Sequence, residues 1–135
     1  GLGKPETFDF LGFTFYCSTN STGSFFRCKV RTSRKKLRAK IKIMREWIKY
    51  NRNMPLKQLF EKVNMKLRGH YQYYGVTDNY VEMLIYRNQT MKQLFYWMNR
   101  RSDKRSYTWE TFNGGLLRTF PLLKPRISVS LIPSN

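Results

Sequence analysis

The chain has 135 residues, of which 26 are Lys or Arg and 8 are Asp or Glu, so its formal net charge is +18 at pH 7. This length predicts one small domain, and this charge favours a polyanionic partner, either nucleic acid or, far less favoured, an anionic membrane surface. No apolar run approaches the roughly 18 residues of a membrane-spanning helix, so a membrane protein is much less favoured than a nucleic-acid-binding one.

Two N-terminal strands are predicted, over 8–16 and 25–31, on either side of a polar loop rich in Ser and Thr. In the second strand apolar residues alternate with basic ones, which predicts one buried and one cationic face. Gly12 interrupts the first strand, where we expect a β-bulge or a close approach of another backbone. Cys17 and Cys28 could pair across this hairpin, but buried free thiols are favoured because nothing marks the chain as secreted.

A basic amphipathic helix is predicted next, capped by Thr32 or Ser33 and ending near 51–53. Six cations recur in it every three or four residues and therefore share one face: Lys35, Arg38, Lys42, Arg45, Lys49 and Arg52. The apolar residues occupy a different arc: Leu37, Ile41, Met44, Trp47 and Ile48. Between Arg27 and Arg68 sixteen Lys and Arg stand against two acids, and a merely solvated face mixes both signs. We therefore interpret this face as a nucleic-acid-binding surface.

Two further helices are predicted. The first opens at Pro55, ends at Gly75 and carries an apolar stripe: Leu56, Leu59, Phe60, Val63 and Leu67. Gly69 within it costs about 1 kcal/mol relative to Ala, which suggests a close crossing by another backbone. The other begins at Thr77 or Asp78, ends at 100–101, and has this inner stripe: Val81, Leu84, Met91, Leu94, Phe95 and Met98.

The C-terminal residues predict a short helical turn at 109–113, stopped by 114–115, and an edge strand over 127–131. The expected fold class is mainly α with a small β part. It consists of an N-terminal β-hairpin over 1–31, an antiparallel three-helix bundle over 32–101 and an irregular basic tail over 102–135.

Several side chains are candidates for more than packing. Tyr71 and Tyr74 continue the apolar stripe of the second helix and are expected in the core, whereas Tyr73 is expected to be exposed and able to stack an unpaired base. His70 is interpreted as a buried histidine whose hydrogen bonds are satisfied. The acids are scattered, so we assign no catalytic residue, and the two cysteines and one histidine lack the spacing of a metal site.

Five segments in series resemble the C-terminal part of bacterial group II intron reverse transcriptase/maturases, with matching order and spacing from about Lys4 to Leu131. They are PETFDFLGF at 5–13, TSRKK at 32–36, LRGHYQYYG at 67–75, WMNRR at 97–101 and WE at 109–110. The resemblance implies the end of the palm followed by the thumb, also called domain X or the maturase-specific domain. It places a primer-proximal hairpin at Phe10, Leu11, Gly12 and Phe13.

This resemblance implies a mobile-element protein that binds its own group II intron RNA to promote splicing. It would also grip the template-primer RNA/DNA duplex during reverse transcription for retrohoming. The family's Tyr-x-Asp-Asp turn does not occur here. The chain alone is therefore expected to be inactive and without a cofactor, with the RNA-directed DNA polymerase centre and its Mg²⁺ in upstream palm and fingers. A bacterial cytoplasmic location, on nucleic acid and not on a membrane, follows from the same resemblance.

The candidate RNA-binding residues are the six cations of the basic helix and a second group: Arg68, Tyr73, Arg100, Arg101, Lys104 and Arg105. A helical bundle with one cationic face can lie along the backbone of an A-form duplex, which offers phosphates and 2′-hydroxyls rather than readable base edges. Two alternatives stay open: a basic architectural RNA-binding protein of ribosomal type, and an enzyme that itself polymerises or cleaves nucleic acid.

Overall fold

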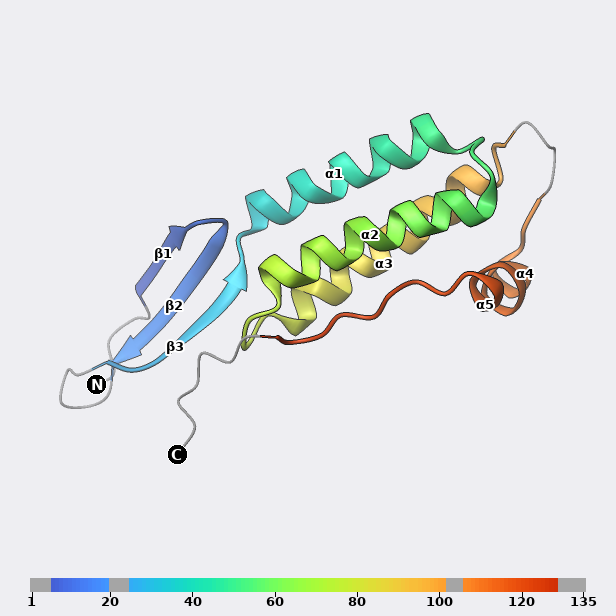
Figure 1. The fold of residues 1–135 in the computed structure, drawn as a ribbon. Coiled ribbons are helices and arrows are strands. Elements are labelled where there is room, and N and C mark those ends of the chain that lie inside the picture. The colour runs from blue at the N-terminus through green and yellow to red at the C-terminus, as the bar shows by residue number, and fades with distance from the viewer. Residues whose placement is uncertain (1–5, 20–24, 102–105, 129–135) are drawn as a thin grey trace.

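The computed structural model describes residues 6–19, 25–101 and 106–128 (Figure 1). A small antiparallel sheet at the N-terminal end is followed by helices, so the predicted fold class is confirmed. The strands are β1 (Glu6–Phe10), β2 (Phe13–Thr19) and β3 (Phe25–Thr32), and the long helices are α1 (Arg34–Asn51), α2 (Leu56–Tyr74) and α3 (Tyr80–Met98). Three short helical segments follow: α4 (Trp109–Thr111), the π-helical turn η1 (Phe112–Leu116) and α5 (Leu117–Thr119).

The sheet has three strands in the order β1-β2-β3, so the prediction of one continuous first strand was wrong. Phe10 pairs with Phe13, which leaves Leu11 and Gly12 as a two-residue hairpin loop. Both loop residues have positive φ, 52° and 85°, as a type I′ turn requires. A Cβ on Gly12 would lie 3.0 Å from the hydroxyl oxygen of Tyr74, so this position favours glycine for its conformation and for its space.

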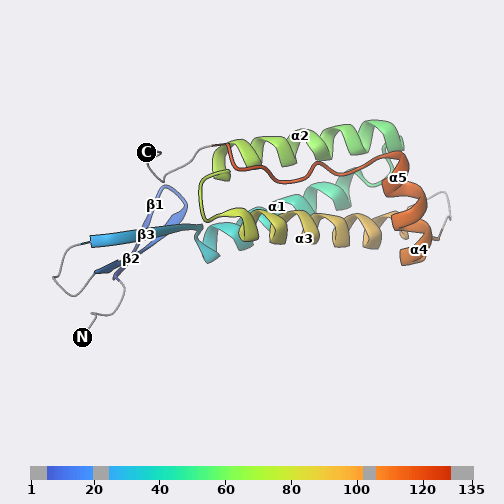
Figure 2. The same cartoon turned by 90° about the horizontal axis from the view of Figure 1, so that it is seen from below.

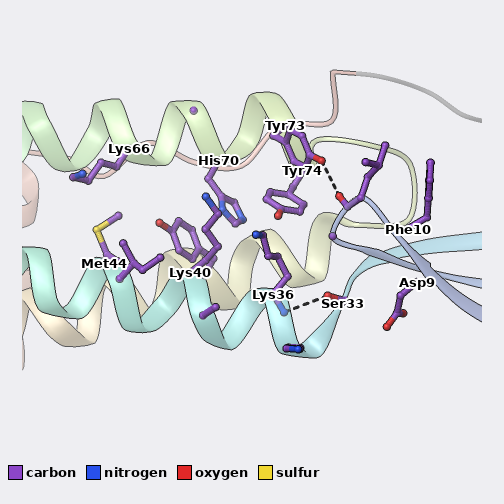
Figure 3. A pocket seen from close by; sticks show the side chains of 17 residues that line it. Asp9, Phe10, Ser33, Lys36, Lys40, Met44, Lys66, His70, Tyr73 and Tyr74 are labelled. Atoms are coloured by element: carbon purple, nitrogen blue, oxygen red, sulfur yellow. Dashed lines mark hydrogen bonds between the residues drawn. The ribbon is translucent and has the colours of Figure 1, made fainter.

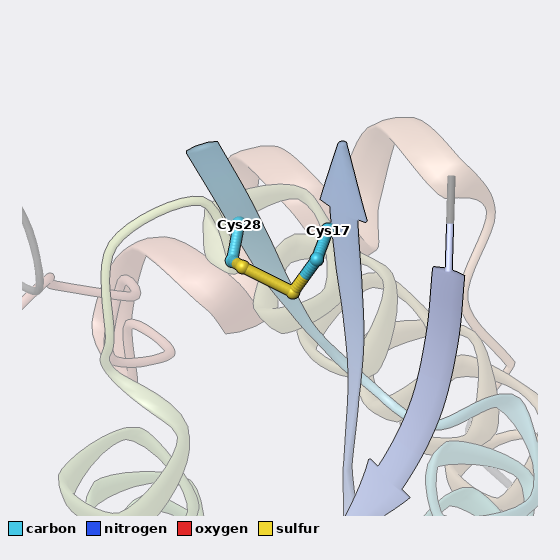
Figure 4. Close-up of a disulfide and its surroundings, with 2 residues drawn as sticks. All are labelled: Cys17 and Cys28. Atoms are coloured by element: carbon cyan, nitrogen blue, oxygen red, sulfur yellow. A yellow bond between two sulfur atoms is a disulfide. The ribbon is translucent and has the colours of Figure 1, made fainter. Parts of the chain in front are cut away.

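The two cysteines form a disulfide between β2 and β3 (Figure 4). Cys17 and Cys28 are direct partners in the antiparallel register, which brings their side chains to the same side of the sheet. The expectation of two free buried thiols was therefore wrong. The pairing of strands, rather than any sequence motif, brings the two sulfur atoms together.

The three long helices form an antiparallel bundle, with α1 and α2 both packed against α3 (Figures 1 and 2). Ser33 caps α1, as predicted, because its hydroxyl oxygen accepts a hydrogen bond from the backbone N–H of Lys36 at 3.2 Å. Helix α2 starts directly after Pro55 and ends at Gly75. Helix α3 begins after Asn79, which lies two residues after Thr77 and one after Asp78, the two caps predicted from the sequence.

Asn79 joins the sheet to the bundle and is fully buried. Its side-chain oxygen accepts a hydrogen bond from the backbone N–H of Thr32 at 2.6 Å, and its amide nitrogen donates to the backbone oxygen of Tyr74 at 2.8 Å. An ion pair of 3.7 Å between Arg31 and Glu82 links β3 to α3 beside it. These contacts hold the end of β3 against the start of α3.

The core contains the apolar arcs of all three helices. Those of α1 and α2 agree with the predicted stripes, since Leu37, Met44 and Ile48 are buried together with four of the five predicted residues of α2, Leu56 being partly buried. On α3 the buried residues are Met83, Tyr86, Thr90, Leu94 and Met98. Val81 was assigned wrongly, because its side chain is 61% exposed on the opposite side of this helix.

The close backbone approach predicted at Gly69 occurs at Gly75 instead. A Cβ on Gly69 would meet nothing within 4 Å, whereas a Cβ on Gly75 would lie 2.7 Å from the backbone oxygen of Arg126. The segment near residue 126 passes here, and the backbone N–H of Ser128 donates to the Gly75 oxygen at 2.8 Å. Gly75 therefore owes its identity to a neighbouring backbone, and Gly69 does not.

The C-terminal residues pack on the bundle more closely than a tail would. The predicted helical turn does not stop at Gly114 and Gly115 but continues through them as η1 and α5. Phe112, Leu116 and Leu122 are buried in the core, and the chain after α5 runs back alongside the bundle toward the sheet (Figures 1 and 2). Of the predicted edge strand, residues 127–128 belong to no strand, and 129–131 lie outside the described residues.

Candidate nucleic-acid interface

Helix α1 carries eight cations and one acid, Glu46, over its 18 residues. Five of the six predicted face residues are exposed: Lys35, Arg38, Lys42, Arg45 and Lys49. We call these five residues the α1 cationic face. Within the described ranges none of these five cations forms an ion pair, not even with Glu46 of the same helix. An 18-residue helix is about 27 Å long, so the face presents an extended, uncompensated row of positive charge.

Arg52, the sixth predicted residue, is half-buried and belongs to the end of the helix rather than to the exposed face. Its guanidinium donates to the backbone oxygens of Lys49 at 2.7 Å and Arg100 at 3.1 Å, and lies 5.4 Å from the centre of the Trp97 ring. These bonds satisfy carbonyl groups that the helix ends leave free. Two of the five N–H donors of Arg52 are thus bonded to the backbone, which holds its side chain against the end of the bundle.

The second group of predicted residues is dispersed. Arg100 lies 3.5 Å over the Tyr96 ring, and Arg101 donates to the backbone oxygen of Met54 at 3.0 Å, so both are tied to the end of the bundle opposite the sheet. Arg68 is exposed, but it lies about 200° around α2 from Lys66, the α2 lysine that faces α1, and so points away from α1. Lys104 and Arg105 lie outside the described residues.

The hairpin of β1 and β2 contacts α2 through the start of β2, and the tip of its turn is exposed. Phe10 and Leu11 are 59% and 66% exposed, whereas Phe13 packs against the rings of Tyr73 and Tyr74. Tyr73 is 52% exposed, as predicted, and its hydroxyl donates to the backbone oxygen of Leu11 at 2.7 Å. This bond holds the hairpin predicted to be primer-proximal beside the C-terminal end of α2.

A groove of about 1020 Å³ lies between α1 and α2 (Figure 3). Tyr86 of α3 also lines this groove. The hairpin turn closes one end of it through Leu11 and Gly12. Three lysines that the sequence analysis did not select line it: Lys36 and Lys40 from α1, and Lys66 from α2. Lys36 and Lys40 are four residues apart, a spacing that could have identified them as a second basic row on the same helix.

His70 is buried at this groove, with 5% of its surface exposed. It stacks on Tyr86 with ring centres 3.8 Å apart and packs against Tyr74 at 4.6 Å. Neither ring nitrogen has a hydrogen-bond partner, so the expectation of a satisfied histidine was wrong. Burial, and then the positive charge of Lys40, lower the pKa of His70 to about 4, which keeps the imidazole neutral at pH 7.

The tyrosines of the bundle behave as core residues. Tyr71 and Tyr74 are buried as predicted, and the Tyr71 hydroxyl donates to the backbone oxygen of Leu123 at 2.8 Å. Burial raises the pKa of Tyr86 to about 12 and raises the pKa values of Tyr71 and Tyr74 as well. All three hydroxyls are therefore protonated at physiological pH.

The described residues contain no group of three or more His, Cys, Asp or Glu side chains that could hold a metal ion. They do not fit the Mg²⁺ expected for a parent polymerase, so no step involving a metal ion is assigned to them. In the part of the chain that the structure describes, no helix is both long and apolar enough to cross a membrane.

No family model matches the chain, and no curated protein or solved structure matches it either. Membership of the maturase family, which five sequence segments suggest, therefore stays a prediction.

Proposed function

We propose that the chain is an RNA-binding domain that lays the α1 cationic face along the backbone of a structured or duplex RNA. The observation that carries this proposal is the row of five exposed, unpaired cations on one side of a rigid helix. Such a row repels itself when the protein is free, and phosphates relieve that repulsion. Its contacts give affinity and orientation with little sequence preference.

The resemblance to group II intron maturases supports a more specific proposal. We propose that the domain is the thumb of a reverse transcriptase, which binds intron RNA during splicing and the template-primer duplex during copying. The upstream palm and fingers of the same protein would supply the polymerase centre, in a bacterial cytoplasm. The exposed hairpin tip lies at the end of the bundle where α1 begins, and the α1 cationic face runs from there along the bundle, an arrangement compatible with that role.

Salt dependence and charge reversal test the proposal. Five phosphate contacts give a slope of log affinity against log salt of about −4.5, so binding should weaken by roughly two to three orders of magnitude between ~50 and ~200 mM salt. Lys42→Glu with Arg45→Glu should weaken binding further and reduce the slope by about 2. Fluorescence anisotropy with a labelled RNA duplex measures both quantities, and circular dichroism checks that the helices remain.

A matched control separates the face from the overall charge. Lys57→Glu with Lys92→Glu makes the same change in net charge at two exposed positions on α2 and α3. The control should retain most of the affinity. An equal loss in both double variants, or an affinity insensitive to salt, would contradict the proposal.

Competition between RNAs tests the maturase proposal. A thumb of this family should prefer a folded group II intron to an unrelated structured RNA of the same length. Equal affinities would instead favour the architectural alternative. Incubation with primer, template, dNTPs and Mg²⁺ tests the enzyme alternative, and any extension by this chain alone would show that a catalytic site was overlooked.

A further inference from the structure

The groove between α1 and α2 has features that its internal packing does not explain. It holds about 1020 Å³ in an open trough beside the α1 cationic face, and Lys35 lines both surfaces. This volume reaches the upper end of the range of small-molecule sites in proteins. The groove is therefore large enough for a flat ligand together with an anionic group.

The charge of the groove is one-sided. Of the described residues that line it, four are lysines and one, Asp9, is an acid at the hairpin end. The carboxylate of Asp9 already accepts a hydrogen bond from the Thr14 hydroxyl at 2.6 Å. Lys36, Lys40 and Lys66 thus face a space that contains no close counter-charge, which favours an anion.

His70 adds a polar group that the protein does not satisfy. Both ring nitrogens are buried without a partner, and a buried donor or acceptor normally has one. Figure 3 shows the Lys40 side chain extended across the groove toward this imidazole. A lysine side chain rotates readily about four bonds, so a ligand can displace it and reach the ring. A neutral imidazole offers one donor and one acceptor.

Gly69 provides the second unexplained feature. A helical glycine is less favourable than alanine, and here a Cβ would meet no atom within 4 Å. The residue lines the groove beside His70. Its missing side chain leaves the floor of the trough open at the point where a ligand could approach the helix closely.

We propose that this groove binds one unpaired nucleotide of an RNA strand. Its phosphate lies between Lys36 and Lys40, and its base enters over Gly69 toward His70 and Tyr86. The lysines hold the phosphate, and the unpartnered ring nitrogens of His70 supply hydrogen bonds to the edge of the base. This inference rests on the proposed RNA-binding function and adds a single-strand site to a surface that otherwise contacts duplex.

The single histidine of the chain makes a direct probe, because its ring Cε1–Hε1 signal in NMR spectra belongs to His70. Titration with an RNA hexamer, oligouridylate or oligoadenylate, should move this signal. A blunt RNA duplex should leave it in place while still binding in the anisotropy assay. Uridine monophosphate should move the signal in the same direction at higher concentration.

Gly69→Leu adds a side chain at a groove position where a Cβ meets no atom within 4 Å, and it should weaken hexamer binding at least tenfold, with duplex affinity changed less than twofold. Gly114→Leu is the matched control, because Gly114 also has open space around it but lies in η1. Lys36→Gln with Lys40→Gln gives an independent test, in which hexamer affinity should again fall at least tenfold.

The outcomes separate this inference from the proposed function. Duplex binding with an unmoved His70 signal, or hexamer binding unaffected by Gly69→Leu, overturns the groove site and leaves the proposed function standing. If inorganic phosphate moves the His70 signal as far as uridine monophosphate does at the same concentration, base insertion is overturned, because the shift then requires only an anion. Failure of both duplex and hexamer to bind overturns the proposed function itself.

Discussion

Mild acid should destabilise this protein through one residue, His70. The imidazole is buried, and burial and the charge of Lys40 lower its pKa from 6.5 to about 4 in the folded state. Between pH 6.5 and pH 4, therefore, His70 is mostly protonated in the unfolded chain and mostly neutral in the folded protein. Stability is full above pH 6.5 and is lost progressively as the pH falls toward 4.

The size of the effect follows from the two pKa values. Between pH 7 and pH 5 the linkage relation predicts a loss of about 2 kcal/mol in the free energy of unfolding. The tyrosines packed around the ring do not titrate in this window, because burial raises the pKa values of Tyr71, Tyr74 and Tyr86 above 10. The charged group that faces the ring is Lys40 from α1. Carboxyl groups titrate mainly below pH 5, so the window isolates the histidine.

Urea denaturation, followed by circular dichroism at pH 7, 6 and 5, measures this loss. His70→Phe is the control, because a phenyl ring retains the stacking on Tyr86 and the native imidazole makes no hydrogen bond to lose. The variant should show almost the same free energy of unfolding at all three pH values. The burial of a neutral His70 would be refuted if the free energy of unfolding of the native protein did not change with pH. It would also be refuted if the variant lost as much stability at pH 5 as the native protein.

Three further perturbations have defined outcomes. Gly69→Ala should raise the free energy of unfolding by about 0.5–1 kcal/mol, since the added methyl group meets no atom, and a fall in thermal midpoint would contradict this. Asn79→Ala should lower it by about 2–3 kcal/mol in urea denaturation, because Thr32 N–H and the Tyr74 carbonyl would lose a buried partner. Reduction of the Cys17–Cys28 disulfide, which spans 11 residues, should cost about 3 kcal/mol in paired denaturations with and without reductant, and equal midpoints would show that the crosslink adds nothing.

The helices were predictable because their signals are local. A stripe of apolar residues every three or four positions reports which side of a helix is buried, whatever it packs against. Leu37, Met44 and Ile48 lie in the core as that rule predicts, and the same periodicity puts the α1 cationic face in solvent. Ser33 capped α1 as expected for the same reason, since a cap bonds its own first turn.

The sheet was less predictable, because a glycine within an apolar segment is compatible with a bulge, a close backbone approach or a turn. Gly12 was predicted to be a bulge or a close approach of another backbone, but with Leu11 it forms a hairpin loop that divides one predicted strand into two. The disulfide depended on the same register, which aligned Cys17 with Cys28. The composition of a segment does not fix where it turns or in which register its strands pair, so composition alone could not choose between these outcomes.

The sequence by itself determined the net charge of this protein, which depends on composition alone. It also determined the number of long helices and the cationic side of α1, because these depend on residues within a few turns of one another. Only the tertiary structure decided what lies between the helices. The groove, the four lysines that line it and the unpartnered ring of His70 come together because α1 and α2 both pack on α3. The space that two helices leave between them depends on their mutual packing, which is not written in the periodicity of either helix.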